Sequence, residues 1–149
     1  MAEADGFRLL DAAQDASLNF VDRHGGRVCP VGGHKGGESE TIIDKWLAKT
    51  GKRKDVIMAT KVGMDMGNGK KGLKPGYIHQ AVEDSLRRLQ TDYADLYQAH
   101  QDDKETPLEE TLRAFDDLVE QGKVRHIGAS NDSGTRLAEA LETTAGSMG

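Results

Sequence analysis

Short apolar runs alternate with amphipathic helical patterns along this chain, and that alternation limits the possible folds more than any other feature of the sequence. The apolar runs occupy residues 19–21, 56–60, 94–99 and 124–129. Runs that lack a polar and apolar alternation are typical of strands buried on both faces. One helical pattern precedes the first run and another follows each run. The sequence therefore predicts an α/β fold with a parallel sheet and helical crossovers.

The predicted helices carry start and stop signals of their own. They cover residues 7–16, a segment from about Ser39, a segment from Pro75, residues 108–119 and residues 135–143. Pro75 suits a first helical position. The sequence Thr106-Pro107-Leu108-Glu109 has the pattern of a capping box, and Gly122 is suited to end the helix that follows it.

The composition narrows the class of protein. A chain of 149 residues is the length of one domain, and 20 basic against 25 acidic residues give a net charge of −5. This balance argues against a nucleic-acid partner, which requires a basic surface. No apolar run approaches the roughly 20 residues of a membrane helix, the N-terminal segment Met1-Ala2-Glu3-Ala4-Asp5 is acidic, and Cys29 is the single cysteine. We expect a cytoplasmic protein without a membrane partner.

A polar residue directly follows each of the four apolar runs that are predicted to be strands. They are Asp22, Lys61, His100 and the pair Ser130-Asn131. The carboxyl ends of parallel strands in a barrel converge on one mouth, where active sites lie. Taken singly, Asp22 could cap a turn, Lys61 and Ser130 could be surface residues, and His100 could be structural. Their repetition at consecutive strand ends favours a functional site.

Several motifs together resemble one known family. They are Asn19-Phe20-Val21-Asp22, Gly37-Glu38-Ser39-Glu40, Ala59-Thr60-Lys61, Ser85-Leu86-Arg87-Arg88-Leu89, the segment from Thr91 to His100 and the segment from Gly122 to Asn131. From about residue 7 to residue 143, the chain is similar to the aldo/keto reductases. The resemblance implies part of a (β/α)8 TIM barrel, with about four parallel strands and flanking helices. Residues 1–149 would form a single partial domain that lacks the first strand and the C-terminal barrel units.

The resemblance also implies an activity and a site. Members of the family use NADP(H) to reduce a small aldehyde or ketone, and a tyrosine donates the proton. The catalytic residues of the family fall on Asp22, Lys61 and His100. Ser130 and Asn131 match the pair that holds the nicotinamide carboxamide, and Asp22 also belongs to the cofactor site. No metal is implied.

The segment after Asp22 departs from the family pattern. The tyrosine of the family comes five residues after the aspartate, where this chain has Arg27. An arginine stays protonated and cannot act as the acid, although His24 in the same segment is an alternative donor. Cys29 and His34 are irregularly spaced and predict no zinc site. We therefore expect impaired activity in this chain.

A shift of reading frame is a hypothesis for this departure. Residues 24–29 can be encoded so that reading one base later gives Thr-Ala-Asp-Val-Tyr, the motif that the family has after the aspartate. On this hypothesis residues 23 to about 33 are translated out of frame. Codons in the gene that cannot give this second reading would rule the hypothesis out.

Half a barrel has two open sheet edges, expected here at residues 18–22 and 124–129. Open edges invite pairing with another chain, and the interior side chains Ile57, Leu96 and Ile127 would lack an opposite wall. We therefore expect self-association through these edges. Two other interpretations remain open: a non-catalytic binding or regulatory module that resembles the family, and a self-associating half-barrel without any ligand.

Overall fold

The computed structural model describes residues 3–22, 38–65 and 69–147. The elements are α1 (Glu3–Asp15), β1 (Phe20–Asp22), α2 (Glu38–Thr50), the short helix η1 (Arg53–Asp55), β2 (Ile57–Val62), α3 (Pro75–Arg88), β3 (Ala94–Ala99), α4 (Leu108–Glu120), β4 (Val124–Ala129) and α5 (Gly134–Ser147). Each predicted strand and helix is present, with ends that differ by a few residues. In these ranges no helix is both long and apolar enough to cross a bilayer.

The four strands form one parallel sheet in the order β1-β2-β3-β4. Sequential order with a helix in each crossover is the pattern of a barrel wall, so the predicted partial α/β barrel is confirmed. The sheet is open, because β1 pairs only with β2 and β4 only with β3 in the described part of the chain. The two edges are therefore those expected from the sequence.

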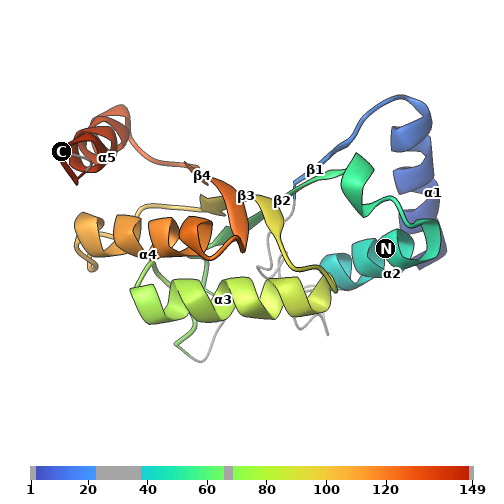
Figure 1. Ribbon diagram of the computed structural model, residues 1–149, viewed down its shortest axis with the longest axis horizontal. Helices are drawn as coiled ribbons and strands as arrows, with labels where there is room; N and C mark the ends of the chain where they lie inside the picture. Colours follow the sequence, from blue (N-terminus) through green and yellow to red (C-terminus); the bar gives the residue numbers. More distant parts are fainter. Residues whose placement is uncertain (1–2, 23–37, 66–68, 148–149) are drawn as a thin grey trace.

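Helices α3 and α4 lie side by side along one face of the sheet, whereas α1 and α2 lie at the β1 end and α5 at the β4 end (Figure 1). Alternate strand residues point into this helical layer, and Met58, Thr60 and Tyr97 are completely buried. The Tyr97 hydroxyl donates to the Ile78 carbonyl at 3.2 Å. A second cluster, centred on Trp46, packs α2 against the start of β2.

In the described part of the chain the opposite face of the sheet is uncovered at Ile57, as expected for an interior side chain without an opposite wall, so β2 is not buried on both sides there. Ile57 is 42% exposed although its neighbour Met58 is fully buried. Ile127 differs from the prediction. It is in register with Tyr97 and so faces the helices, where it lines a cavity of about 220 Å³ between α4 and α5. Register with the neighbouring strand, rather than the local sequence, decides which face Ile127 occupies.

Two of the three helix-end predictions are correct. Pro75 is the first residue of α3, and α4 ends just before Gly122, whose φ of +71° lets its N–H bond back to the Val119 carbonyl. The capping box is wrong. Pro107 is the N-cap of α4, and the Thr106 hydroxyl instead donates to Asp103 Oδ2 at 2.8 Å.

Asp95 joins three strands at the amino end of the sheet. Its Oδ2 accepts hydrogen bonds from Arg53 Nη1 at 3.0 Å and from the Met58 N–H at 2.9 Å. Its Oδ1 accepts one from Arg125 Nη1 at 3.3 Å. The two guanidinium groups lie on the ring of Tyr93, each 4.1 Å from its centre. A charged cluster thus stabilises the amino end of the sheet.

Candidate functional site at the carboxyl ends of the strands

Three of the predicted site residues come from neighbouring strands. Asp22 is the last residue of β1, Lys61 lies near the end of β2, and His100 directly follows β3. The His100 N–H donates to the Val62 carbonyl at 2.7 Å, which places His100 beside the end of β2. Because all the strands are parallel, the structure brings these side chains to one end of the sheet.

Lys61 and Asp22 form a direct ion pair. Lys61 Nζ lies 2.8 Å from Asp22 Oδ2, and the Lys61 side chain is only 15% exposed whereas that of Asp22 is 42% exposed. A partly buried ammonium requires a carboxylate partner, since burial of an unpaired charge is costly. The pair thus holds a positive charge at a fixed position on the open face of the sheet.

His100 responds electrostatically to this ion pair. Burial lowers the pKa of His100 below its usual value, the charge of Lys61 lowers it further, and the charge of Asp22 acts in the opposite direction. The imidazole is therefore neutral at neutral pH. A neutral imidazole has one donor and one acceptor nitrogen, so it can position a polar ligand atom by a hydrogen bond.

Ser130 and Asn131 follow β4 and lie beside His100. The Ser130 N–H donates to the Ala99 carbonyl at 2.8 Å. Asn131 Nδ2 donates to the His100 carbonyl at 2.8 Å and to Ser130 Oγ at 3.1 Å. Asn131 has a φ of +59°, a conformation that asparagine tolerates better than most residues. The pair is thus held beside His100 by hydrogen bonds to the backbone carbonyls of Ala99 and His100.

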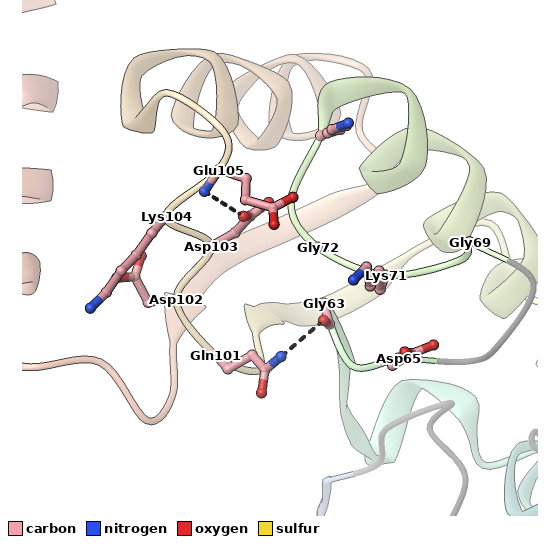
Figure 2. A pocket seen from close by; sticks show the side chains of 11 residues that line it. Gly63, Asp65, Gly69, Lys71, Gly72, Gln101, Asp102, Asp103, Lys104 and Glu105 are labelled. Atoms are coloured by element: carbon pink, nitrogen blue, oxygen red, sulfur yellow. Dashed lines mark hydrogen bonds between the residues drawn. The ribbon is translucent and has the colours of Figure 1, made fainter.

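The loops that continue β2 and β3 enclose a cavity of about 370 Å³ next to this group (Figure 2). Gln101 Nε2 donates to the Gly63 carbonyl at 3.4 Å, which joins the two loops. The ionisable side chains that line the cavity are Asp65, Lys71, Lys74, Asp102, Asp103, Lys104 and Glu105. Three of these side chains are cationic and four are anionic, and this balance does not favour the binding of an anion.

Asp103 fixes the shape of these loops, although the sequence analysis did not identify it. It accepts hydrogen bonds from the Leu73 N–H at 2.7 Å, from the Glu105 N–H at 2.9 Å and from the Thr106 hydroxyl. Burial alone would raise the pKa of Asp103, but these hydrogen bonds outweigh burial and lower it. A Cβ on Gly72 would lie 2.8 Å from Asp103 Oδ2, and the φ of Gly72 is +77°. Glycine is therefore required there.

The sequence analysis also did not identify Asp102 and Asp132, two acidic residues near Arg136. Asp102 Oδ1 accepts a hydrogen bond from Arg136 Nε at 2.9 Å, which ties α5 to the loop after β3. Burial raises the pKa of Asp132, as does the nearby charge of Asp102, while Arg136 lowers it. Asp102 comes two residues after His100 in the sequence, and this position could have identified it as a candidate. Residues that follow parallel strands lie at the same end of the sheet.

The predicted residues after Asp22 lie outside the described residues. Arg27, at the position of the family's tyrosine, is one of them. The others are His24, the alternative proton donor, and Cys29 and His34, for which no zinc site was predicted. Their interpretation continues to rest on the sequence alone.

The chain matches the model of the aldo/keto reductase family over residues 1–148. It is 39% identical over 145 residues to "Uncharacterized oxidoreductase YrpG" of Bacillus subtilis, a match that covers 93% of this chain and 44% of that protein. It is 39% identical over 108 residues to "Aldo-keto reductase yakc [NADP(+)]" of Schizosaccharomyces pombe, covering 70% of this chain and 32% of that protein.

A third relative is "Aryl-alcohol dehydrogenase GME11368" of Pestalotiopsis microspora, which is 33% identical over 132 residues. This match covers 84% of the chain and 33% of that protein. The chain thus spans between about a third and a half of the length of these curated relatives.

Proposed function

This chain belongs to the aldo/keto reductase family, and from that premise we propose that the carboxyl end of its sheet is part of an NADPH-dependent site for the reduction of an aldehyde or ketone. The observation that carries the proposal is the 2.8 Å contact between Lys61 Nζ and Asp22 Oδ2. It sets an ammonium of fixed position beside the neutral imidazole of His100. Reduction of a carbonyl builds negative charge on its oxygen, and a preorganised cation and donor stabilise that charge.

Each of the three side chains has a role in this proposal. Lys61 stabilises negative charge on the carbonyl oxygen and lowers the pKa of a nearby proton donor. Asp22 holds the ammonium in place through their direct contact. His100, neutral at neutral pH because of its lowered pKa, donates a hydrogen bond that orients the carbonyl.

Ser130 and Asn131 suit a carboxamide ligand. The Nδ2 of Asn131 is engaged with the His100 carbonyl and Ser130 Oγ, so the amide presents its oxygen as an acceptor, and the Ser130 hydroxyl can donate and accept. A carboxamide offers the complementary donor and acceptor. NADPH, when bound, would supply the hydride for the reduction. The name of the Schizosaccharomyces pombe relative, which includes NADP(+), supports this choice of cofactor.

The substrate class is proposed from a relative. Because the Pestalotiopsis protein carries the name aryl-alcohol dehydrogenase, we take aromatic aldehydes as the first class of carbonyl to test.

Turnover by these 149 residues alone is proposed to be impaired. Arg27 occupies the position of the family's tyrosine, and an arginine has no proton to give at ordinary pH. The same observation favours a second candidate, a module that binds NADPH without turnover.

Two measurements test these proposals. Titration of NADPH fluorescence should detect binding, which Asn131→Ala should weaken by about tenfold through the loss of a hydrogen-bonding group. The control Gln121→Ala lies before β4, at the opposite end of the sheet, and should bind as the unaltered protein does. Absence of any NADPH binding would contradict both candidates and favour a half-barrel without ligand.

Oxidation of NADPH in the presence of an aromatic aldehyde separates the two candidates. We expect none with the unaltered chain. In a repaired variant, Arg23→Thr, His24→Ala, Gly25→Asp, Gly26→Val and Arg27→Tyr restore the family's sequence after Asp22. Turnover by the repaired chain would identify the missing tyrosine as the cause of impairment. Equal lack of turnover would attribute it to the portion of the relatives that the chain does not span.

A further inference from the structure

The cavity of about 220 Å³ between α4 and α5 lies on the helical side of the sheet, behind the carboxyl ends of β3 and β4 (Figure 1). Small-molecule sites typically have an apolar wall and a few polar groups that orient the ligand. The wall of this cavity is mostly apolar, and its side chains include Leu73, Phe115, Ile127, Leu137 and Leu141. Its few polar groups therefore indicate which ligand would fit.

Four polar side chains line the cavity, and three of them are engaged within the protein. The hydroxyls of Thr111 and Thr144 donate to backbone carbonyls, and Asp102 Oδ1 accepts a hydrogen bond from Arg136 Nε. Asp132 differs, since its Oδ1 is shielded from solvent and accepts no hydrogen bond within the described part of the chain. Nearly all buried polar atoms in proteins are paired, so a ligand of this cavity should bring a hydrogen-bond donor to Asp132.

The charges around Asp132 favour a donor that is also a cation. The neighbouring guanidinium of Arg136 already pairs with Asp102 and with Glu139, each at 2.9 Å. Burial raises the pKa of Asp132, the charge of Asp102 raises it further, and Arg136 lowers it by less than these two raise it. An ammonium beside Asp132 would balance this carboxylate and supply the missing hydrogen bond.

We propose that this cavity binds a small arylalkylamine, with the ring among the apolar side chains and the ammonium donating to Asp132 Oδ1. An apolar cavity of about 150 Å³ holds one benzene molecule, so 220 Å³ leaves room for a short alkyl chain as well. The site is separate from the proposed carbonyl site, because Ile127 in its wall and Lys61 point to opposite faces of the sheet. The proposal is therefore independent of NADPH binding.

Titration of the 149-residue protein with 2-phenylethylamine, followed by backbone amide signals in two-dimensional NMR spectra, tests the proposal. The signals of Ala129, Asp132 and Leu137, which line the cavity, should shift and reach saturation. The dissociation constant should be about 1 mM or lower, as expected for a ligand of this size. The uncharged isostere 2-phenylethanol should shift the same signals but bind about tenfold more weakly, because it lacks the charge.

Variants separate the carboxylate from the apolar wall. Asp132→Asn removes the charge and keeps the shape, so it should weaken binding of the amine about tenfold and change binding of the alcohol less than about twofold. Ala140→Phe places a ring in the cavity and should abolish binding of both compounds. Asp116→Asn, on the exposed side of α4, is the matched control and should change neither dissociation constant. The far-ultraviolet circular dichroism of Asp132→Asn should match that of the unaltered protein.

Three results would overturn the proposal. Absence of saturable shifts at amine concentrations up to roughly twenty times the expected constant would leave the cavity for packing against a further part of a longer protein. Equal affinity of the amine for the unaltered protein and for Asp132→Asn would remove the carboxylate from the site. Shifts confined to His100, Ser130 and Asn131 would place the amine at the proposed carbonyl site instead.

Discussion

At the scale of single residues, the charge of Lys61 acts on two neighbours in opposite ways. It forms an ion pair with the Asp22 carboxylate by direct contact. It also disfavours the protonated form of His100 and so lowers the pKa of that residue. Burial, the larger cause, and the position of this ammonium therefore together favour the neutral imidazole. This coupling needs no ligand, so it can be measured in the protein as it stands.

We predict that Lys61→Met raises the pKa of His100, because it removes a positive charge that lowers this pKa. Asp22→Asn should lower the pKa of His100 further, because Asp22 raises it. Titration of the imidazole signals by NMR, with His100→Gln to assign the signal, measures both shifts. If the two substitutions move the pKa in the same direction, the proposed coupling is wrong.

The lowered pKa of His100 also predicts a dependence of stability on pH. In the unfolded chain a histidine has a pKa near 6.5, and in the folded protein that of His100 is lower. Between these two values the unfolded chain binds more protons, so the contribution of His100 to stability is complete above about pH 6.5 and falls as the pH is lowered through this window. In His100→Gln this part of the pH dependence should be absent from urea unfolding curves.

Asp103 supports the loops beside the site through three hydrogen bonds. Asp103→Ala should destabilise the protein by about 2–3 kcal/mol, since hydrogen bonds to a charged group contribute strongly and their donors would lose a partner. Because its folded pKa is lowered, this contribution should be present at neutral pH and be lost as the pH falls below about 4. Asp116→Ala, on the exposed side of α4, should cost less than about 0.5 kcal/mol in the same urea unfolding experiment.

At the scale of elements, Gly122 ends α4 in the left-handed conformation, with a φ of +71°. Gly122→Ala should destabilise the protein by about 1–2 kcal/mol, because a Cβ disfavours this conformation. No atom lies within 4 Å of the added Cβ, so the cost would be purely conformational. Gly134→Ala, at the start of α5 and equally unobstructed, should leave the melting temperature unchanged or slightly raised. Equal losses at the two glycines would contradict this interpretation.

At the scale of the whole molecule, Asp95 links β2, β3 and β4 through its contacts with Met58, Arg53 and Arg125. Asp95→Ala should destabilise the fold by about 3–5 kcal/mol, because it leaves a partly buried guanidinium without its carboxylate. The exposed neighbour Asp92 serves as control, and Asp92→Ala should change stability by less than about 0.5 kcal/mol. Thermal unfolding followed by the circular dichroism of the helices measures both.

The sequence by itself determined the order of strands and helices and the end of the sheet at which Asp22, Lys61 and His100 gather. Those features are local, since the side-chain period identifies each element and parallel strands share one carboxyl edge. Only the tertiary structure decided that Ile127 faces the helices, that Thr106 bonds to Asp103 instead of capping α4, and that Asp95 joins three strands. Register between strands and bonds between distant side chains depend on the geometry of neighbouring elements, which no local pattern records.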